Sequence, residues 1–415
     1  MNQEFLSFGE ELRRRRLCAG LSLSKLAQSV HYSKGQLSKV ERGIKAPSRE
    51  LARLCDTVLQ ANGRLTSLVS PGPTSRRQLL TAGALAVPAL YLGHTTMSVN
   101  IDHADLAGIF RSLFDHYRNL GQDNDPRMLL PPLTAQANAI QEFAKISGGH
   151  TSRMLLILGS RYAEYTGWLA QETGNDLAAL RWTRRAADLA NAADDTGFAA
   201  YGLVRHALVT LYRDDARQTV QLASRAQASC LPPRIRGLAA AREAQGHAIG
   251  ADYNSAMRAL DRASILLSTV AADTEQPVIG TGNVADPVEM IRGWCLYDLG
   301  RPSDAAKIIE RQLATIPRNA TRARARYAAR RALSCAVAGD IDQACLLATD
   351  LLDDVARVRS ATIAKDLHAL AHSLGRYQRH QAVRELSPRL GTALSYHPTV
   401  KGTHSGRGVH QLPAR

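Results

Sequence analysis

A short run of residues near the start of the chain is rich in side chains that hydrogen-bond or carry positive charge. It contains Ser33, Lys34, Gln36, Ser38 and Lys39, and Arg42 and Lys45 follow closely. Gln and Lys side chains can hydrogen-bond base edges in the major groove of DNA, whereas Ser, Lys and Arg bind phosphate. The run therefore predicts contact with double-stranded DNA, if one helix presents these side chains together.

The pattern around the run predicts such a helix. Ser33 and Gln36 form an S-x-x-Q capping box, in which each side chain bonds the backbone amide of the other residue. Leu37 and Val40 are spaced to face inward, and Gly43 is suited to end the helix.

Three further short helices are expected around this one. The helix before it starts at Ser22, and the turn at residues 31–33 joins the two into a helix-turn-helix. The helix that opens the chain is expected to bury Phe5, Phe8, Leu12 and Leu17, and the fourth helix starts at Pro47-Ser48. Residues 1–70 are thus predicted to form a small helical module.

Residues 8–59 resemble the helix-turn-helix of the XRE (Cro/repressor-like) family. The resemblance rests on Gly20-Leu21-Ser22, Leu26-Ala27, residues 33–43 and Pro47-Ser48. It implies that Arg42 lies near DNA phosphate at the end of the recognition helix. One departure is Leu23, which stands where the family often has a Gln that touches the DNA backbone. A helical bundle with a solvated basic face is the alternative interpretation.

The composition of the whole chain points the same way. The chain has 415 residues and a formal net charge of +15, which favours an anionic partner such as nucleic acid. Its apolar residues are mostly Ala and Leu, which favour helices, so an all-α fold is expected. The six Cys show no C-x-x-C spacing, and the chain opens on polar and charged residues. We therefore expect a reduced, cytoplasmic protein without a signal peptide.

Four zones are expected along the chain. They are a DNA-binding domain (1–70), a linker with an apolar helix (71–100), a helical-repeat domain (101–393) and a disordered tail (394–415). In the linker, Arg76-Arg77 and the apolar residues that follow resemble a twin-arginine export signal. The DNA-binding module in front of it and Pro88 within the apolar run favour a packed connector helix instead.

Turn signals recur through the second half of the chain. They stand at residues 174–176, 214–215, 250–252, 300–302, 339–340 and 375–376, with a period of about 38 residues that indicates an α-solenoid of helix pairs. Ala179, Ala305 and Ala344 follow such turns, where a small residue lets paired helices approach closely. The segment Leu158-Gly159-Ser160-Arg161-Tyr162 and the offsets of Gly293, Ala305 and Pro317 resemble divergent tetratricopeptide repeats.

A solenoid of this kind curls around a concave surface lined by the first helix of each pair. The resemblance implies that Trp294, Tyr297 and Asp298 face this groove, with His247 in the preceding unit. Packing in the core is the alternative role for the two aromatic residues. A ladder of Arg242, Arg292 and Arg331, each at the same distance before a turn glycine, could clamp carboxylates. Solvated or ion-paired helix faces explain the ladder equally well.

No catalytic signature is found in the sequence. Residues 280–285 fit G-x-G-x-x-A, but a dinucleotide site needs a preceding strand, which helical repeats lack. His368 and His372 lie one helical turn apart, and no third metal ligand is suggested. We expect a protein that is not an enzyme and holds no metal or cofactor.

These features predict a bacterial, sequence-specific transcriptional regulator. The N-terminal module would bind operator DNA as a homodimer, and the repeats would dimerise and sense a ligand. Regulators with these two parts resemble peptide-responsive, quorum-sensing-type regulators, which implies a short signalling peptide in the groove. The alternatives are a protein-interaction scaffold with an accessory DNA-binding module and a membrane-tethered regulator.

Overall fold

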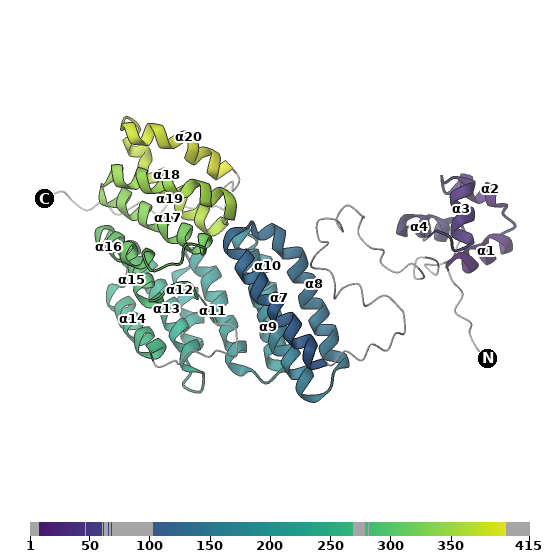
Figure 1. Ribbon diagram of the computed structural model, residues 1–415, viewed down its shortest axis with the longest axis horizontal. Helices are drawn as coiled ribbons and strands as arrows, with labels where there is room; N and C mark the ends of the chain where they lie inside the picture. The colour runs from purple at the N-terminus through teal and green to yellow at the C-terminus, as the bar shows by residue number, and fades with distance from the viewer. Residues whose placement is uncertain are drawn as a thin grey trace. The chain divides into compact units, whose positions relative to one another are not determined.

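The computed structural model describes residues 8–45, 47–59, 61, 65, 68, 103–268, 279–280 and 282–395. The chain divides into two compact units, Met1–Leu90 and Tyr91–Arg415. Every regular element of the described residues is a helix, as the all-α expectation requires (Figure 1). Phe5, the expected linker helix with Arg76-Arg77 and the expected tail beyond Ser395 lie outside the described residues.

The first unit contains four short helices, which are α1 (Phe8–Cys18), α2 (Leu23–Ser29), α3 (Lys34–Glu41) and α4 (Arg49–Val58). Serine caps three of them, because the hydroxyls of Ser22, Ser33 and Ser48 accept hydrogen bonds from amides in the first turns of α2, α3 and α4. The capping box of Ser33 and Gln36 is present. The helix starts predicted from the sequence are therefore confirmed.

Apolar residues from all four helices form one core in this unit. Leu12, Leu26, Leu37 and Cys55 are completely buried there. The prediction for the first helix was wrong at Leu17, whose side chain is 59% exposed. Arg16 is buried in its place, because its guanidinium pairs with Glu41 of α3 and reaches the carbonyl oxygen of Leu21.

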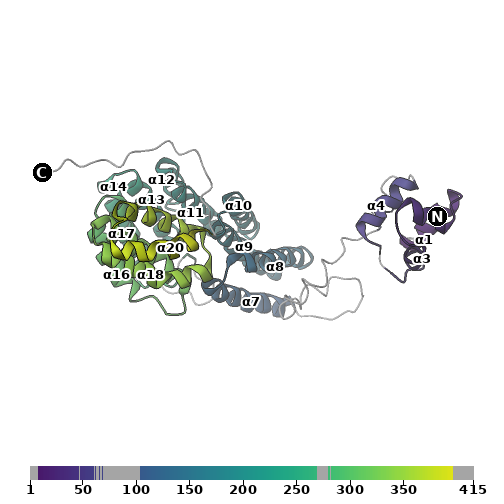
Figure 2. The ribbon, with the colours of Figure 1, turned by 90° about the horizontal axis from the view of Figure 1, so that it is seen from above.

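The second unit is built from helices that pack in pairs. It begins with α7 (His103–Asp123), α8 (Pro126–Ile146), α9 (Gly149–Glu172), α10 (Asp176–Ala192), α11 (Thr196–Tyr212), α12 (Ala216–Arg225) and α13 (Pro233–Ile249). It continues with α14 (Tyr253–Ser268), α15 (Pro287–Asp298), α16 (Pro302–Leu313), α17 (Thr321–Ala338), α18 (Ile341–Val358), α19 (Ala361–Leu374) and α20 (Gln381–Ser395). Successive helices lie side by side from α9 to α14 and from α15 to α18 (Figures 1 and 2).

The turns inside the pairs are those that the sequence predicts. The backbone is left-handed at Gly174, Asp214, Ala251, Gly300 and Gly339, each between the two helices of one pair. The small residues that follow three of these turns, Ala179, Ala305 and Ala344, are completely buried. Close approach of paired helices at alanine is thus confirmed, and the unit is an α-solenoid.

The solenoid closes back on its own beginning. Helix α7 contacts α17 and α18, and α9 contacts α19. Polar contacts also bind α19 to the earlier helices, since Lys365 of α19 donates to the carbonyl oxygen of Tyr212 and to the carboxylate of Asp214, both at 2.7 Å. The first helices of the pairs consequently surround an interior space. Among the described residues, no helix has the length and apolar character that crossing a membrane requires.

Candidate DNA-binding face and ligand cavity

The predicted DNA-binding side chains gather on and just after α3. Lys34, Gln36 and Lys39 are exposed on this helix, and Ser38 is half-buried. Arg42 and Lys45 are exposed in the turn that follows. The capped N-terminus of α3 belongs to the same surface, because Ser33 is exposed too. A single helix and its two ends therefore present all seven residues.

Two of these side chains also make contacts within the protein. The amide oxygen of Gln36 accepts the hydrogen bond of the capping box from the backbone N–H of Ser33, at 3.4 Å, which leaves its NH2 group as a donor. Arg42 donates from Nε to the carbonyl oxygen of Ser38 at 3.3 Å. Both remain exposed, so these contacts orient the side chains and leave donors for DNA.

Helix α1 fixes the position of α3 through two close contacts. The ion pair between Arg16 and Glu41 has oxygen–nitrogen distances of 2.6 and 3.0 Å and is largely buried. Gly9 of α1 lies against the end of α3, where a Cβ atom would be only 2.6 Å and 2.7 Å from the carbonyl oxygens of Glu41 and Val40. The helix that presents the candidate DNA contacts is thus held at a defined distance.

Leu23 has a structural role in this unit. It is half-buried and packs against the core formed by α1 to α4. An apolar side chain there cannot supply the hydrogen bond to the DNA backbone that Gln often makes in the XRE family. Any contact of α2 with the DNA backbone must therefore come from groups other than the side chain of Leu23.

The interior of the second unit holds a cavity of about 470 Å³. Helices α7, α9, α11, α13, α15 and α17 and residues near position 280 line it. Aromatic rings form much of the wall, including Tyr165, Trp168, Tyr201, Trp294 and Tyr327. This size and composition are typical of sites for small organic ligands.

The charged residues of the cavity wall are almost all arginines. Glu164 is the one acidic residue among the described lining residues. The arginines are Arg118, Arg161, Arg205, Arg234, Arg242, Arg322 and Arg326. They come from five different helices, and the cavity therefore carries a strong positive field.

Four of these arginines have acidic partners at the wall. Arg205 pairs with Glu164 at 3.0 Å, and Arg161 lies 3.7 Å from Asp195. Arg322 and Arg326 both pair with Glu172. Their charges are at least partly compensated by the protein.

Arg118, Arg234 and Arg242 form no ion pair with any carboxylate of the described residues. Arg234 donates two hydrogen bonds to the carbonyl oxygen of Ile279, at 2.6 and 3.1 Å, and Arg242 donates to Gln245. Burial lowers the pKa of Arg234 and of Arg242. Because an arginine stays protonated in proteins, these two guanidinium groups bring charge that no described carboxylate compensates into a partly desolvated space.

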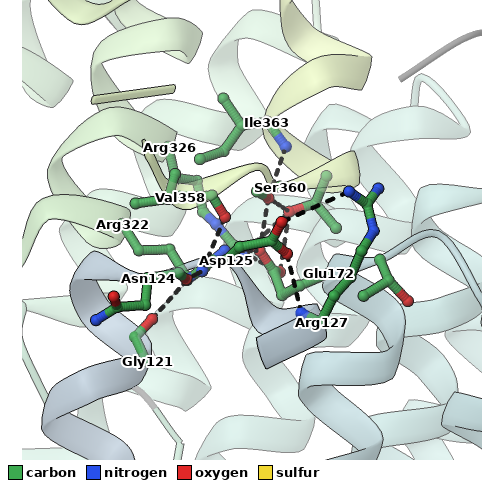
Figure 3. Close-up of polar contacts among 12 residues, drawn as sticks. Gly121, Asn124, Asp125, Arg127, Glu172, Arg322, Arg326, Val358, Ser360 and Ile363 are labelled. Carbon is green, nitrogen blue, oxygen red and sulfur yellow. Dashed lines mark hydrogen bonds and ion pairs between the residues drawn. The ribbon is translucent and has the colours of Figure 1, made fainter. Parts of the chain in front are cut away.

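A buried polar cluster closes the solenoid beside the cavity (Figure 3). Glu172 of α9 accepts hydrogen bonds from Arg322 and Arg326 of α17 and from Ser360 and Thr362 at the start of α19. Burial alone would raise the pKa of Glu172, but the charges of Arg326 and Arg322 outweigh it and lower the pKa to about 2. The carboxylate is therefore ionised and joins three helices.

Arg322 completes this closure at the other side of the cluster. It donates to the carbonyl oxygens of Gly121 (2.7 Å), Asn124 (2.5 Å) and Val358 (3.0 Å) as well as to Glu172 (Figure 3). Its donors are thus engaged within the protein, which marks Arg322 as a structural residue.

Only some of the residues predicted to face the groove line the cavity. Trp294 lines the cavity, with its ring edge-on to Tyr212. The guanidinium of Arg330 lies 3.8 Å from the centre of the Trp294 ring and 5.0 Å from that of Tyr297. Asp298 pairs with the same Arg330 at 3.4 Å. Tyr297 and Asp298 therefore belong to a cluster around Arg330 and do not line the cavity.

Asp298 has an unusual environment within this cluster. Its Oδ2 atom is buried without a hydrogen-bond partner in the described part of the chain. Burial raises the pKa of Asp298 to about 6, against the opposing charge of Arg330. His247 lies elsewhere, 3.6 Å from Glu243 and 3.9 Å from Asp252 at the end of α13, and is not part of the cavity wall.

The arginine ladder is divided in the same way. Arg242 lines the cavity, whereas Arg292 pairs with Glu289 and Asp261, and Arg331 pairs with Glu310. The described residues of the G-x-G-x-x-A segment also line the cavity, with helices around them instead of the strand that a dinucleotide site needs. No group of three or more metal-ligating side chains occurs in the part of the chain that the structure describes.

Sequence reasoning missed most of the cavity arginines and the carboxylate of Glu172. One signal was available, because Arg161 is a charged residue inside the repeat motif of residues 158–162, whose neighbours Leu158 and Tyr162 are buried. The other arginines carry no local signal that separates them from the many arginines of the solvated helix faces.

One family model matches the N-terminal part of the chain. Residues 7–68 match the family model described as "Helix-turn-helix domain". The first unit is therefore an XRE-type helix-turn-helix domain, joined in one chain to a helical-repeat unit. No curated protein matches the chain.

One similar solved structure is that of a Rap protein complexed with Competence and Sporulation Factor, determined by crystallography. It is 12% identical and aligns over 93% of this chain and 98% of the other chain, with a TM-score of 0.42. A TM-score below 0.5 does not establish a shared fold, so the architecture of the second unit rests on its own helices.

Proposed function

We propose that this chain is a sequence-specific, ligand-responsive regulator of transcription without enzymatic activity. The first unit binds an operator through α3, and the second unit senses a ligand in its cavity and provides a homodimer contact. The observation that carries the proposal is the pairing of an exposed, capped helix rich in DNA-binding side chains with a separate unit that encloses a cavity of ligand size.

The DNA-binding part is tested by in vitro selection of bound sequences, followed by fluorescence anisotropy with the selected duplex. Gln36 and Lys39 are exposed on α3, so the double variant Gln36→Ala/Lys39→Ala should lose sequence preference. A good bidentate base contact contributes about 1–3 kcal/mol, or roughly 5- to 150-fold in affinity. A phosphate contact by Lys39 would instead weaken all sequences alike and flatten the salt dependence.

The matched control is Arg53→Ala, which also removes one positive charge from an exposed helical position, on α4. It should bind the selected duplex nearly as the unchanged protein does. If Arg53→Ala and Lys39→Ala, as single variants, reduced affinity for the selected duplex equally, binding would depend on charge alone. That result would contradict a recognition role for α3.

The homodimer is proposed because one helix-turn-helix covers only a short half-site, and such domains act in pairs on half-sites about one helical turn apart. Light scattering on the full chain measures its mass directly. A mass near the 45.0 kDa of one chain, at concentrations that saturate the selected duplex, would contradict it.

The scaffold interpretation makes a different prediction for the cavity. If the second unit only docked a partner protein, filling the cavity would leave DNA affinity unchanged. A ligand acts as a switch only when it binds the DNA-competent and incompetent forms unequally. Operator affinity measured with and without a cavity ligand therefore separates the two functions.

A further inference from the structure

Among the described residues, the wall of the cavity carries more positive charge than nearby carboxylates neutralise. Seven described arginines line it, and the described carboxylates that pair with them are those of Glu164, Glu172 and Asp195. Uncompensated charges in a partly desolvated space cost free energy and repel one another. A fold that keeps them there gains stability when a bound group neutralises them.

Four of the cavity arginines come from three neighbouring helices. Arg161 lies on α9, Arg205 on α11, and Arg234 and Arg242 on α13, and α11 packs against α13. The guanidinium of Arg161 lies 3.6 Å from the centre of the Phe198 ring on α11. These arginines therefore line the cavity from helices that contact one another.

The arginines differ in how many of their donors remain available. Arg322 uses its donors on Glu172 and three carbonyl oxygens. Arg234 uses Nε and Nη2 on the carbonyl oxygen of Ile279 and keeps Nη1. Arg242 uses Nη1 on Gln245 and keeps Nη2 and Nε. The donors of Arg322 are thus engaged within the protein, whereas Arg234 and Arg242 keep N–H groups that can donate to a ligand.

We propose that the cavity binds a small organic ligand with two or more carboxylate or phosphate groups, held by Arg234, Arg242 and their neighbours. This inference rests on the proposed function, since it names the chemistry of the signal that the second unit senses. The guanidinium fork matches carboxylate and phosphate oxygens in a bidentate geometry. The aromatic wall formed by Tyr165, Trp168 and Tyr327 contacts the carbon frame of the ligand.

The chain contains its own probe for such binding. Its three tryptophans are Trp168, Trp182 and Trp294. Trp168 and Trp294 line the cavity, so intrinsic fluorescence responds directly to a ligand there. The experiment titrates the full chain with citrate and, separately, with inorganic pyrophosphate at constant ionic strength set by sodium chloride. The neutral ester triethyl citrate is the control for shape without charge.

We expect saturable binding of at least one anion with a Kd below about 1 mM, and a rise in the unfolding temperature that saturates with it. Binding of citrate alone would assign carboxylates as the ligand groups, and binding of pyrophosphate alone would assign phosphates. Arg242→Gln should weaken binding by about tenfold or more, since hydrogen bonds to charged groups contribute strongly to affinity.

The matched control is Arg292→Gln on α15. It removes the same charge from a residue that pairs with Glu289 and Asp261 and does not line the cavity. Its affinity for the anions should equal that of the unchanged protein. The proposal is overturned if neither anion binds saturably, if triethyl citrate binds as well as citrate, or if the two variants behave alike.

The two levels of proposal fail in different ways. Anions that do not bind, in a chain that still recognises its selected duplex, contradict the assignment of the cavity only. An anion that binds saturably but leaves operator affinity unchanged contradicts ligand sensing and leaves the assignment intact.

Discussion

The candidate DNA-binding face takes its side chains from one eight-residue helix and the residues that flank it, whereas the cavity takes its arginines from five helices of the second unit. The first site is exposed, and its geometry follows once α3 is formed and held by α1. The second is interior, and it exists only because the solenoid closes on itself. The stability of the second site therefore depends on long-range polar contacts, and that of the first on a small apolar core.

The largest expected effect comes from removing the carboxylate of Glu172, which joins the helices that close the solenoid. Glu172→Ala leaves Arg322 and Arg326 buried without the carboxylate that each pairs with. We expect a loss of about 3–5 kcal/mol in the free energy of unfolding, as for other broken buried ion pairs. Urea unfolding followed by tryptophan fluorescence measures it, because all three tryptophans lie in the second unit.

A matched carboxylate at the surface is Glu310, which pairs with Arg331 and is half exposed. Glu310→Ala should cost less than about 1 kcal/mol, since exposed ion pairs contribute little. Similar losses in the two variants would mean that closure does not depend on the buried cluster.

The second prediction concerns pH and the cluster around Arg330. The pKa of Asp298 is raised from its ordinary 3.8 to about 6, so the folded chain keeps this proton at pH values where the unfolded chain has lost it. This contribution to stability is complete below about pH 4 and is lost as the pH rises through 6. Stability of the second unit should therefore increase by roughly 1–3 kcal/mol between pH 7 and pH 5.

Asp298→Asn should reduce this increase, as measured by urea unfolding at the two pH values. Some increase should remain, because burial also raises the pKa of Asp366 beside the same Arg330. Asp304→Asn, at an exposed ion pair with Arg301, should keep the full increase. An unchanged pH dependence in Asp298→Asn would contradict the raised pKa.

The third prediction addresses the first unit. Gly9→Ala would place a Cβ atom less than 3 Å from two carbonyl oxygens at the end of α3, so the two helices must separate. Such overpacking costs about 1–3 kcal/mol. Hydrogen exchange in peptides covering residues 8–58 should accelerate, while the tryptophan-detected unfolding of the second unit stays the same.

The control for this clash is Gly35→Ala on α3, where the added Cβ meets no atom within 4 Å. It should leave exchange unchanged or slow it, since Ala is a better helix former than Gly. Faster exchange in this variant than in Gly9→Ala would show that the α1–α3 contact is not close.

The smallest expected effect is a gain in stability. Ala251 has a φ of +61° in the turn between α13 and α14, where a side chain is strained. Ala251→Gly should stabilise the second unit by up to about 1 kcal/mol, because the relieved strain exceeds the entropy cost of glycine. Ala248→Gly, in the buried end of α13, should destabilise it instead, and a gain there would contradict this explanation.

Most features that were predicted correctly from the sequence depend on interactions between residues close together in the chain. Serine caps, the capping box of Ser33 with Gln36 and the turn glycines act within about four residues, so their structural effect is readable directly. Among the described residues of the first unit, the apolar spacing also predicted the core positions, apart from Leu17. The prediction that Leu17 is buried was wrong because Arg16 is buried there instead. Its partner Glu41 lies on another helix, so no local pattern indicates the pair.

The amino-acid sequence by itself determined an all-helical fold with a capped helix that carries the candidate DNA contacts, and a succession of helix pairs. Only the tertiary structure decided which arginines meet in the cavity and which form ion pairs outside it. Arg242 and Arg292 occupy the same register in neighbouring repeats, yet one lines the cavity and the other does not. The reason is that the partners of an arginine often lie on other helices: Asp261 of α14 reaches Arg292, and closure brings Arg322 against the carbonyl oxygen of Gly121, 201 positions away in the chain.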